Sequence, residues 1–288
     1  MYKLGSVGIG GSNPVRIMGI LNTSPESFYK KSIKITKQDI GDTVSKMEDD
    51  GADFIDVGGM STAPYLTTMV SERIETQRIK NAIKIIQNTT NLPISIDTCR
   101  SSVAKQAFDE GAVILNDVTG LKYDSKILNV IEKYQISVII CAYSKKQVSG
   151  NQVSITKKLL KQSISLAKSS KISSKSIVLD PAIGFFRRTG KGSFFTKTNA
   201  EWFNRDLLII QNLKLIKQQY PILVSVSNKS FIGKILNEEN PTDRLVGSLA
   251  VEAFSVISGT DIIRTHNVKE TKDVVTIAQR LSRTNKSL

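Results

Sequence analysis

The residues Ile177-Val178-Leu179-Asp180-Pro181-Ala182-Ile183-Gly184-Phe185 form a short apolar run that ends in a carboxylate, a proline and a glycine. Branched apolar residues in such a run favour a buried β-strand, and proline and glycine mark the place where it stops. An apolar run followed by a polar residue occurs eight times along the chain. We therefore expect eight strands and, at their ends, the candidate active site.

The other runs of this kind are spread evenly over the chain, and amphipathic segments such as 243–257 separate them. Thr36 is expected to cap the first helix and Ser101 or Ser102 a later one, because these side chains accept hydrogen bonds from exposed helix N–H groups. Gly51 and Gly111 are expected to end these two helices. The eight expected strands lie at residues 16–21, 54–57, 94–96, 113–115, 137–140, 176–179, 222–226 and 261–263.

Short apolar strands that alternate with amphipathic helices indicate a parallel sheet covered by helices. Eight such units in a chain of 288 residues match the size of a (β/α)8 TIM barrel. An open, doubly wound α/β sheet is the alternative. No change in composition marks a linker, so we expect a single domain over residues 1–288, with residues 1–14 forming a short N-terminal hairpin or arm.

Composition restricts the class of protein. No segment approaches the ~20 continuous apolar residues of a membrane span, and the N-terminus lacks the apolar core of a secretory signal. The two cysteines, Cys99 and Cys141, have no metal-ligand spacing, which favours buried thiols in a reducing compartment such as the cytoplasm. The net charge of +14 comes from scattered lysines, which favours solvated helix faces with local anion binding. A nucleic-acid partner is not expected, because barrels of this pattern present no groove-reading helix.

Polar residues at the ends of the expected strands are the candidate site, because barrel enzymes place their chemistry there. Amide and carboxylate groups could pair with a heterocycle, and Lys229, Arg264 and His266 could supply positive charge for a phosphate. Any single member has an alternative structural explanation, and Asp124 is expected only to begin a turn or helix. The candidate set is Asn22, Thr62, Asp97, Asn116, Asp180, Lys229, Arg264 and His266.

Seven motifs follow one another along the chain: Met18-Gly19-Ile20-Leu21-Asn22-Thr23-Ser24-Pro25-Glu26-Ser27-Phe28, residues 51–62, Ser95-Ile96-Asp97-Thr98, Asn116-Asp117-Val118-Thr119-Gly120, Asp180-Pro181-Ala182-Ile183-Gly184-Phe185, Ser227-Asn228-Lys229-Ser230-Phe231-Ile232-Gly233 and Arg264-Thr265-His266-Asn267-Val268. In sequence and in order they resemble the motifs of dihydropteroate synthase, the pterin-binding barrel of folate synthesis. Several departures within them suggest a divergent member of an archaeal type.

The resemblance implies that 6-hydroxymethyl-7,8-dihydropterin diphosphate condenses with 4-aminobenzoate or a related aryl amine and releases diphosphate, with Mg²⁺ as cofactor. It also implies a homodimer. By matching motif positions, Asp97, Lys229 and Asn22 are the expected catalytic residues, and Asn22 the expected contact to the metal. The expected substrate-binding residues are Thr62, Asp97, Asn116, Asp180, Phe185, Lys229, Arg264 and His266.

The departures from the family pattern lie in the loops that handle catalysis and the second substrate. Lys30 replaces a loop carboxylate, and Ala63 and Asn228 stand where the family has arginine. Phe186-Arg187 replaces the usual Gly-Lys. Residues 186–204 that follow are rich in basic and aromatic side chains, which is compatible with an acceptor clamp or with a mobile lid.

Three alternatives to the plain synthase reaction stay open at this point. The acceptor could carry a sugar phosphate, as a ribosylated aminobenzene phosphate does. The chain could bind pterin without synthase activity, or it could be a pterin-dependent methyltransferase. The Asn22-Thr23-Ser24-Pro25 and Ser227-Asn228-Lys229-Ser230 motifs favour a synthase over a methyltransferase.

Overall fold

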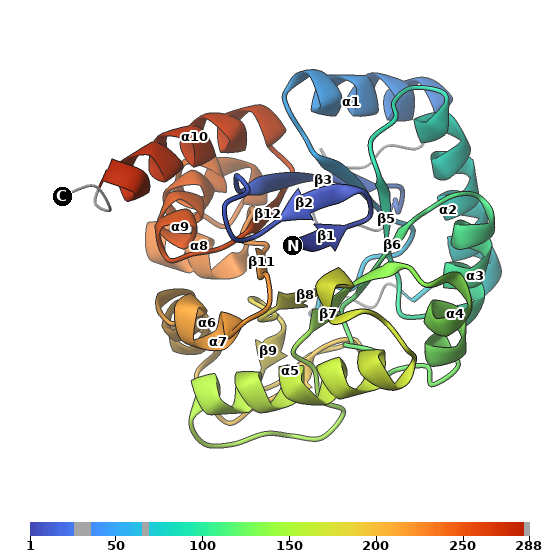
Figure 1. Cartoon of the computed structure of the whole chain (residues 1–288). Coiled ribbons are helices and arrows are strands. Elements are labelled where there is room, and N and C mark those ends of the chain that lie inside the picture. Colours follow the sequence, from blue (N-terminus) through green and yellow to red (C-terminus); the bar gives the residue numbers. More distant parts are fainter. Residues whose placement is uncertain (26–35, 65–68, 285–288) are drawn as a thin grey trace.

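The computed structural model describes residues 1–25, 36–64 and 69–284, with side chains up to residue 282. Within these residues, parallel strands form a ring that a layer of helices surrounds (Figure 1). In order around the ring, the strands are β11 (Leu223–Val224), β12 (Ile262–Thr265), β3 (Arg16–Asn22), β4 (Phe54–Gly58), β5 (Ile94–Asp97), β6 (Ile114–Asp117), β7 (Ser137–Cys141) and β8 (Ile177–Asp180).

The ring closes between β8 and β11. Leu179 and Ile222 form an isolated parallel bridge, and the N–H of Leu179 donates to the carbonyl of Pro221 at 2.9 Å. This closure confirms the predicted TIM barrel, and the alternative of an open sheet is wrong. β11 is shorter than the expected 222–226, because the chain turns at Asn228, whose φ is +58°, and the N–H of Lys229 donates to the carbonyl of Val226.

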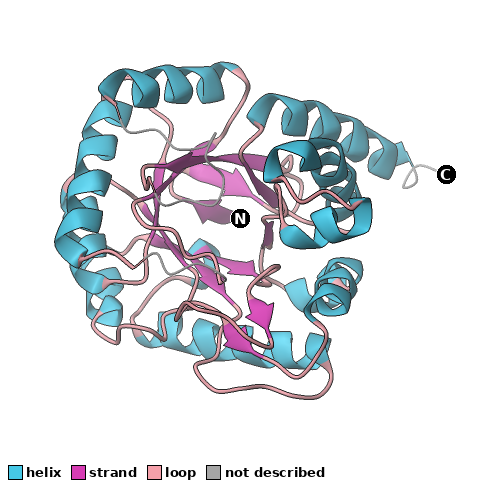
Figure 2. Ribbon diagram, turned by 180° about the vertical axis from the view of Figure 1, so that it is seen from behind, coloured by secondary structure: helices cyan, strands magenta, loops and turns pink. Residues whose placement is uncertain are grey.

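The helices lie outside the strands on all sides that Figure 2 displays. Thr36 caps the first helix as expected, accepting from the N–H of Asp39 at 3.0 Å. In chain order, the α-helices are α1 (Lys37–Asp49), α2 (Glu72–Gln87), α3 (Ser101–Asp109), α4 (Ile127–Tyr134), α5 (Gln152–Ser169), α6 (Trp202–Gln211), α7 (Leu213–Lys217), α8 (Ser230–Leu236), α9 (Leu245–Ile257) and α10 (Val268–Thr284).

The start of α3 differs from the expectation. Neither Ser101 nor Ser102 is its cap, because Arg100 takes the capping position without a side-chain bond. The carboxylate of Asp124 instead accepts from the N–H of Ser101 at 2.8 Å and from the N–H of Lys126 at 3.0 Å. Asp124 thus begins the turn before α4, but the expectation that it does only this, beginning a turn or helix, is wrong, since its carboxylate also satisfies an exposed N–H of α3, which is distant in sequence.

Two glycines set the junctions from helix to strand. Gly51 has a φ of +90° and Gly111 a φ of +101°, a left-handed conformation that side chains disfavour. In both places the next N–H, that of Ala52 or Ala112, bonds back to a carbonyl in the last turn of the helix. This motif ends the helix and directs the chain into the following strand, as the matching sequences predicted.

The N-terminal hairpin of β1 (Tyr2–Leu4) and β2 (Val7–Ile9) covers one end of the barrel, at the centre of Figure 1. Leu4 and Ile9 are buried against side chains that point into the barrel, among them Met18 and Phe54. Because apolar side chains fill this end, a polar site is left to the opposite end, where the strands finish. None of the described helices is long and apolar enough to cross a membrane.

Candidate active site

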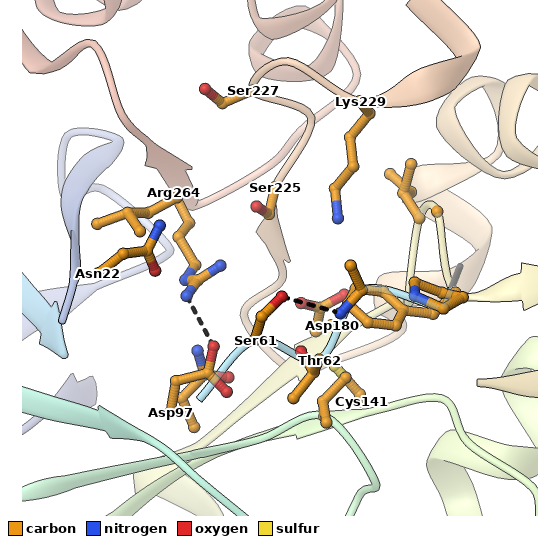
Figure 3. Close-up of a pocket in the computed structure, with 18 of the residues that line it drawn as sticks. Asn22, Ser61, Thr62, Asp97, Cys141, Asp180, Ser225, Ser227, Lys229 and Arg264 are labelled. Atoms are coloured by element: carbon orange, nitrogen blue, oxygen red, sulfur yellow. Dashed lines mark hydrogen bonds and ion pairs between the residues drawn. The ribbon is translucent and has the colours of Figure 1, made fainter. Parts of the chain in front are cut away.

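A single pocket at the C-terminal ends of the strands brings together all the predicted site residues. The strands supply some of these side chains directly, and the loops that follow the strands supply the others (Figure 3). Residues separated by more than 200 positions thus meet in one cavity, as the barrel topology requires. The predicted residues that line it are Asn22, Thr62, Asp97, Asn116, Asp180, Phe185, Lys229, Arg264 and His266.

Arg264 joins two carboxylates on the floor of the pocket. Its Nε donates to Asp56 Oδ2 at 2.6 Å, and its Nη2 donates to Asp97 Oδ2 at 2.9 Å, the dashed contact in Figure 3. Asn116 Nδ2 also donates to Asp56 Oδ2, at 3.0 Å. Asp56 is fully buried, and its other carboxylate oxygen has no hydrogen-bond partner among the described residues. The guanidinium is thereby held in a fixed position by β4 and β5.

Charge is tightly coupled in this cluster. Burial raises the pKa of the Asp97 carboxyl to about 7, Arg264 lowers it and Asp56 raises it further. Burial alone would lower the pKa of Arg264, but Asp56 and Asp97 outweigh it and raise that pKa above its usual value. Arg264 therefore stays charged, and Asp97 changes its protonation near neutral pH.

Asp180 and Lys229 form the second polar cluster. The N–H of Ala182 donates to Asp180 Oδ1 at 2.7 Å, which fixes the carboxylate at the end of β8. Burial raises the pKa of Asp180, and the bond from Ala182, the charge of Lys229 and the thiol of Cys141 oppose the rise. The Nζ of Lys229 lies 4.5 Å from the centroid of the Phe185 ring. A carboxylate, an ammonium and an aromatic face thus surround one volume.

At neutral pH Lys229 is mostly protonated and positively charged, whereas the His266 ring is neutral. Burial lowers the pKa of Lys229 to about 8, although Asp180 raises it. Burial lowers the pKa of His266 to about 3, and the charges of Arg264 and Lys229 add to this effect. The expectation that His266 supplies positive charge is therefore wrong. Its neutral ring is instead held by Ser227, whose Oγ lies 2.9 Å from Nδ1.

Sequence reasoning missed several residues of the site. Asp56 stands in the middle of an apolar strand, and that position was a usable signal, because a carboxylate there must point into the barrel or against a helix. Arg187 was noted only as a departure from the family motif. The remaining lining residues were given no role in the site, although several of them lie within the family motifs; they are Ile20, Met60, Ser61, Ala63, Pro64, Val118, Cys141, Ile183, Gly184, Ser225, Ser227 and Ser230.

The variant motif positions have different structural roles. Ala63 lines the pocket. Asn228 is buried away from it, where its N–H donates to Ser248 and its carbonyl accepts from Arg244. Phe186 is fully buried, with the guanidinium carbon of Arg205 3.8 Å from its ring centroid. Lys30 lies outside the described residues.

The basic segment after β8 is folded against its surroundings. It contains the parallel pair β9 (Phe186–Arg187) and β10 (Thr196–Lys197). The N–H of Lys191 donates to the carbonyl of Pro64 at 2.9 Å, and the hydroxyl of Tyr143 donates to the carbonyl of Ser193 at 2.9 Å. These contacts support a packed wall of the pocket over a mobile lid.

The described residues contain no group of three or more His, Cys, Asp or Glu side chains placed to hold a metal ion. An ion held entirely by such side chains is therefore not a feature of the described site. Asn22 lines the pocket from the end of β3 and offers an amide oxygen. Mg²⁺ commonly binds one or two protein oxygens and completes its coordination with water and substrate phosphates, so the donor set fits a substrate-bound ion.

Comparison with known proteins assigns this arrangement to a family. A family model described as pterin binding enzyme matches residues 18–266. The dihydropteroate synthase of Clostridium beijerinckii is 34% identical over 271 residues, which cover 93% of this chain and 94% of that protein.

Two solved structures agree with this match. A dihydropteroate synthase from Clostridium difficile, determined in the presence of pteroic acid, is 32% identical with a TM-score of 0.82, covering 98% of this chain and 99% of that one. The Xanthomonas albilineans dihydropteroate synthase with 4-aminobenzoic acid is 25% identical with a TM-score of 0.81, covering 93% of both chains. The chain therefore belongs to the pterin-binding enzyme family and, within it, to the dihydropteroate synthases, which are transferases.

Proposed function

We propose that this site joins 6-hydroxymethyl-7,8-dihydropterin diphosphate to 4-aminobenzoate, forming dihydropteroate and diphosphate in folate synthesis. The observation that carries the proposal is that every predicted site residue, from seven separate motifs, lines the same pocket. The amine nitrogen gives its electron pair to the pterin methylene carbon, and the bond from that carbon to oxygen breaks toward diphosphate. The amine then releases a proton.

The cluster of Asp180, Lys229, Phe185 and Asn116 would hold the pterin ring. A pterin edge offers amino and ring N–H donors beside ring and carbonyl acceptors. The carboxylate of Asp180 accepts from the donors, and the ammonium of Lys229 donates to an acceptor. The fixed position of Asp180, set by the N–H of Ala182, supports this role, since a preorganised carboxylate needs little reordering when the ring binds.

Asp97 is suited to stabilise the positive charge that develops on the methylene as diphosphate leaves. A fixed carboxylate in a site with little water acts strongly on such a charge. Because Asp56 and Asp97 share one guanidinium, that of Arg264, this side of the pocket is rich in negative charge. Arg264 would then hold the Asp97 and Asp56 carboxylates in position, in addition to its expected contact with diphosphate.

Asn22, Thr62 and His266 would take the diphosphate. The neutral ring of His266, oriented by Ser227, can donate an N–H to a phosphate oxygen without adding charge. Asn22 would share Mg²⁺ with the diphosphate. When bound there, the ion would offset the negative charge that builds on the departing oxygens.

The plain acceptor, 4-aminobenzoate, is favoured by the relatives. The Xanthomonas albilineans enzyme was solved with 4-aminobenzoic acid and the Clostridium difficile enzyme in the presence of pteroic acid. A methyltransferase has no support from these comparisons. The archaeal character of the chain, and an acceptor that carries a sugar phosphate, stay predictions.

Retained activity is supported by the roles of the variant positions. Asn228 and Phe186 are buried and do not line the pocket, so neither variant side chain occupies space that a substrate needs.

We also infer one domain over residues 1–288, supported by the hairpin that packs into the barrel. A cytoplasmic location is inferred from Cys99 and Cys141, both free and buried.

A homodimer through α9 is our proposal for the assembly. This helix buries Ser248, Glu252, Ser255 and Val256. It exposes Val246 at 78% and Ile257 at 50%. Exposed apolar side chains that gather on one face mark a candidate contact surface, and Ile277 and Leu281 of the neighbouring α10 are similarly exposed. Because closed symmetric dimers are the commonest oligomers, a second copy is the occupant that we propose.

The test is to incubate the purified protein with pterin diphosphate, Mg²⁺ and 4-aminobenzoate and to identify the product by mass. Formation of dihydropteroate with stoichiometric diphosphate supports the proposal. Tight binding of pterin diphosphate without turnover of any aryl amine contradicts it and identifies a pterin-binding protein that lacks synthase activity.

A further inference from the structure

The turn after β8 carries two of the side chains that we assign to the pterin ring. Asp180 precedes the turn and Phe185 follows it, and both line the pocket. Two residues of the turn have left-handed backbones, Ala182 with a φ of +58° and Gly184 with a φ of +87°. Glycine adopts this conformation readily, whereas alanine does so at a cost in free energy. Contacts from elsewhere in the fold must therefore hold the turn in this shape.

A buried ion pair on α6 supplies these contacts. Arg205 Nη2 donates to the carbonyl of Pro181 at 2.7 Å, and Arg205 Nη1 donates to the carbonyl of Ala182 at 3.0 Å. The N–H of Gly184 donates to both carboxylate oxygens of Asp206 at 3.1 Å. Two carbonyls and one N–H of the turn are therefore bonded to two neighbouring side chains of a single helix.

The ion pair is itself fixed on several sides. Arg205 Nη1 lies 3.1 Å from Asp206 Oδ1, and neither side chain is exposed to solvent. The hydroxyl of Thr156 on α5 accepts from Arg205 Nη2 at 3.2 Å. The Phe186 ring covers the guanidinium, with 3.8 Å between its centroid and the central carbon of Arg205. Arg187 is a more distant partner of Asp206, at 3.8 Å. The pair thus connects α5, α6 and the turn.

Stability alone does not account for this pair. Two charges lose their hydration when they are buried, and apolar side chains of similar volume are often equally stable in such a place. The Nε of Arg205 is also buried without a hydrogen-bond partner among the described residues, which adds to the cost. Apolar side chains could not, however, bond to the three backbone groups of the turn. The distinctive contribution of the pair is therefore the geometry that it imposes on residues 181–184.

We propose that Arg205 and Asp206 are positioning residues for the pterin ring. They fix the turn that presents Asp180 and Phe185, and neither of them lines the pocket itself. The inference rests on the proposed function and extends it to residues outside the pocket. A turn that is ordered in advance has little freedom to lose when the ring binds, so the pair raises affinity without touching the substrate. Phe186, which stands where the family motif has glycine, completes the arrangement by covering the guanidinium.

The test measures the Kd for pterin diphosphate by calorimetry in Arg205→Met and in the double variant Arg205→Met/Asp206→Leu. Both should bind roughly 10-fold more weakly, the effect expected when one or two side chains must be ordered on binding. The double variant should unfold at a higher denaturant concentration than Arg205→Met, because the single change leaves a buried carboxylate without its main partner. If Arg205→Met does not fold, the double variant alone decides the test. Arg205→Lys, which keeps the charge, should lose less affinity than either.

Arg16→Met is the matched control, because Arg16 forms a similar pair at the opposite end of the barrel. Its Nη1 lies 2.8 Å from Asp53 Oδ1, and its Nε donates to the carbonyl of Gly8 at 3.1 Å. This variant should lose stability but keep the parent Kd within about twofold, as for a distant site. An unchanged Kd in the double variant would overturn the inference. An equally large loss of affinity in Arg16→Met would do the same, since affinity would then follow stability.

Hydrogen exchange separates this inference from the proposed function. The peptide that contains Gly184, followed by mass spectrometry, should exchange roughly 10-fold faster in the double variant than in the parent, because the N–H of Gly184 loses its acceptor. If the parent does not bind pterin diphosphate, the proposed function fails, while this exchange still decides whether the pair orders the turn. Unchanged exchange in the double variant would overturn the inference in either case.

Discussion

Replacing Arg264 by methionine tests the charge coupling at the floor of the site. The change keeps much of the apolar stem and removes the guanidinium that bonds to Asp56 at 2.6 Å and to Asp97 at 2.9 Å. Asp56 is fully buried and the Arg264 side chain only 15% exposed, so two carboxylates lose their counter-ion in a site that water hardly reaches. Breaking such a pair typically costs about 3–5 kcal/mol. For a chain of this size, that loss lowers Tm by roughly 10 °C.

The loss should depend on pH in a defined direction. Burial raises the pKa of Asp97 to about 7, and Arg264 is the charge that opposes this rise. Without Arg264, the folded-state pKa moves further above the unfolded value of ~3.9. Below pH 7 the Asp97 carboxyl is mostly protonated in both folded proteins. The extra loss of stability therefore grows as the pH rises above 7, and the variant should be closer to the parent at pH 6 than at pH 8.

Denaturation in guanidinium chloride at pH 6 and pH 8, followed by circular dichroism and by fluorescence of Trp202, measures this difference. Lys105→Met is the control, because Lys105 pairs with Asp109 at a similar 2.7 Å but both side chains are exposed, at 47% and 41%. Solvent screens that pair, so its removal should change stability little. If Arg264→Met costs no more than Lys105→Met, or costs more at pH 6 than at pH 8, the coupling argued here is refuted.

Three further substitutions test other parts of the site. Asp180→Asn should weaken pterin diphosphate binding roughly 10- to 100-fold, because charge-assisted hydrogen bonds to the ring are lost. Its denaturation midpoint should stay near that of the parent. Unchanged affinity by calorimetry would show that Asp180 does not bind the pterin. His266→Ala should raise KM for pterin diphosphate with little effect on kcat between pH 6 and pH 8. Burial lowers the pKa of His266 to about 3, so the ring is neutral over this range. A large fall in kcat alone, in steady-state kinetics, would contradict a binding role. Val246→Glu should convert the dimer to a monomer in sedimentation. Ile74→Glu on α2, also at an exposed apolar position, should leave the dimer intact. A dimer that persists in Val246→Glu would place the interface elsewhere.

Much of the fold could be predicted from the sequence, because strand, turn and capping signals are local. The branched apolar runs and the glycines at positions 51 and 111 mark where strands begin and helices end. Alternation of strands and helices then leaves few topologies, and parallel strands place their C-terminal ends together. The residues that follow these ends, such as Asn22 and Asp180, could be assigned to one pocket for this reason.

The remaining features depend on contacts between distant segments. The cap of α3 comes from Asp124, 23 residues after Ser101, and no local pattern identifies it. The position of Arg187 is fixed by Trp202 and Ser230, which reach it only through tertiary packing. The charge of His266 depends on its burial beside two cations, so residue type alone led to the wrong expectation.

If one pocket carries out the condensation, the purified chain should form the product, and this can be measured directly. With pterin diphosphate, Mg²⁺ and 4-aminobenzoate, mass spectrometry should detect dihydropteroate, and Asp97→Asn should slow its formation while pterin diphosphate still binds. The absence of dihydropteroate, with pterin diphosphate bound and other aryl amines also unreacted, would contradict a synthase function for this pocket.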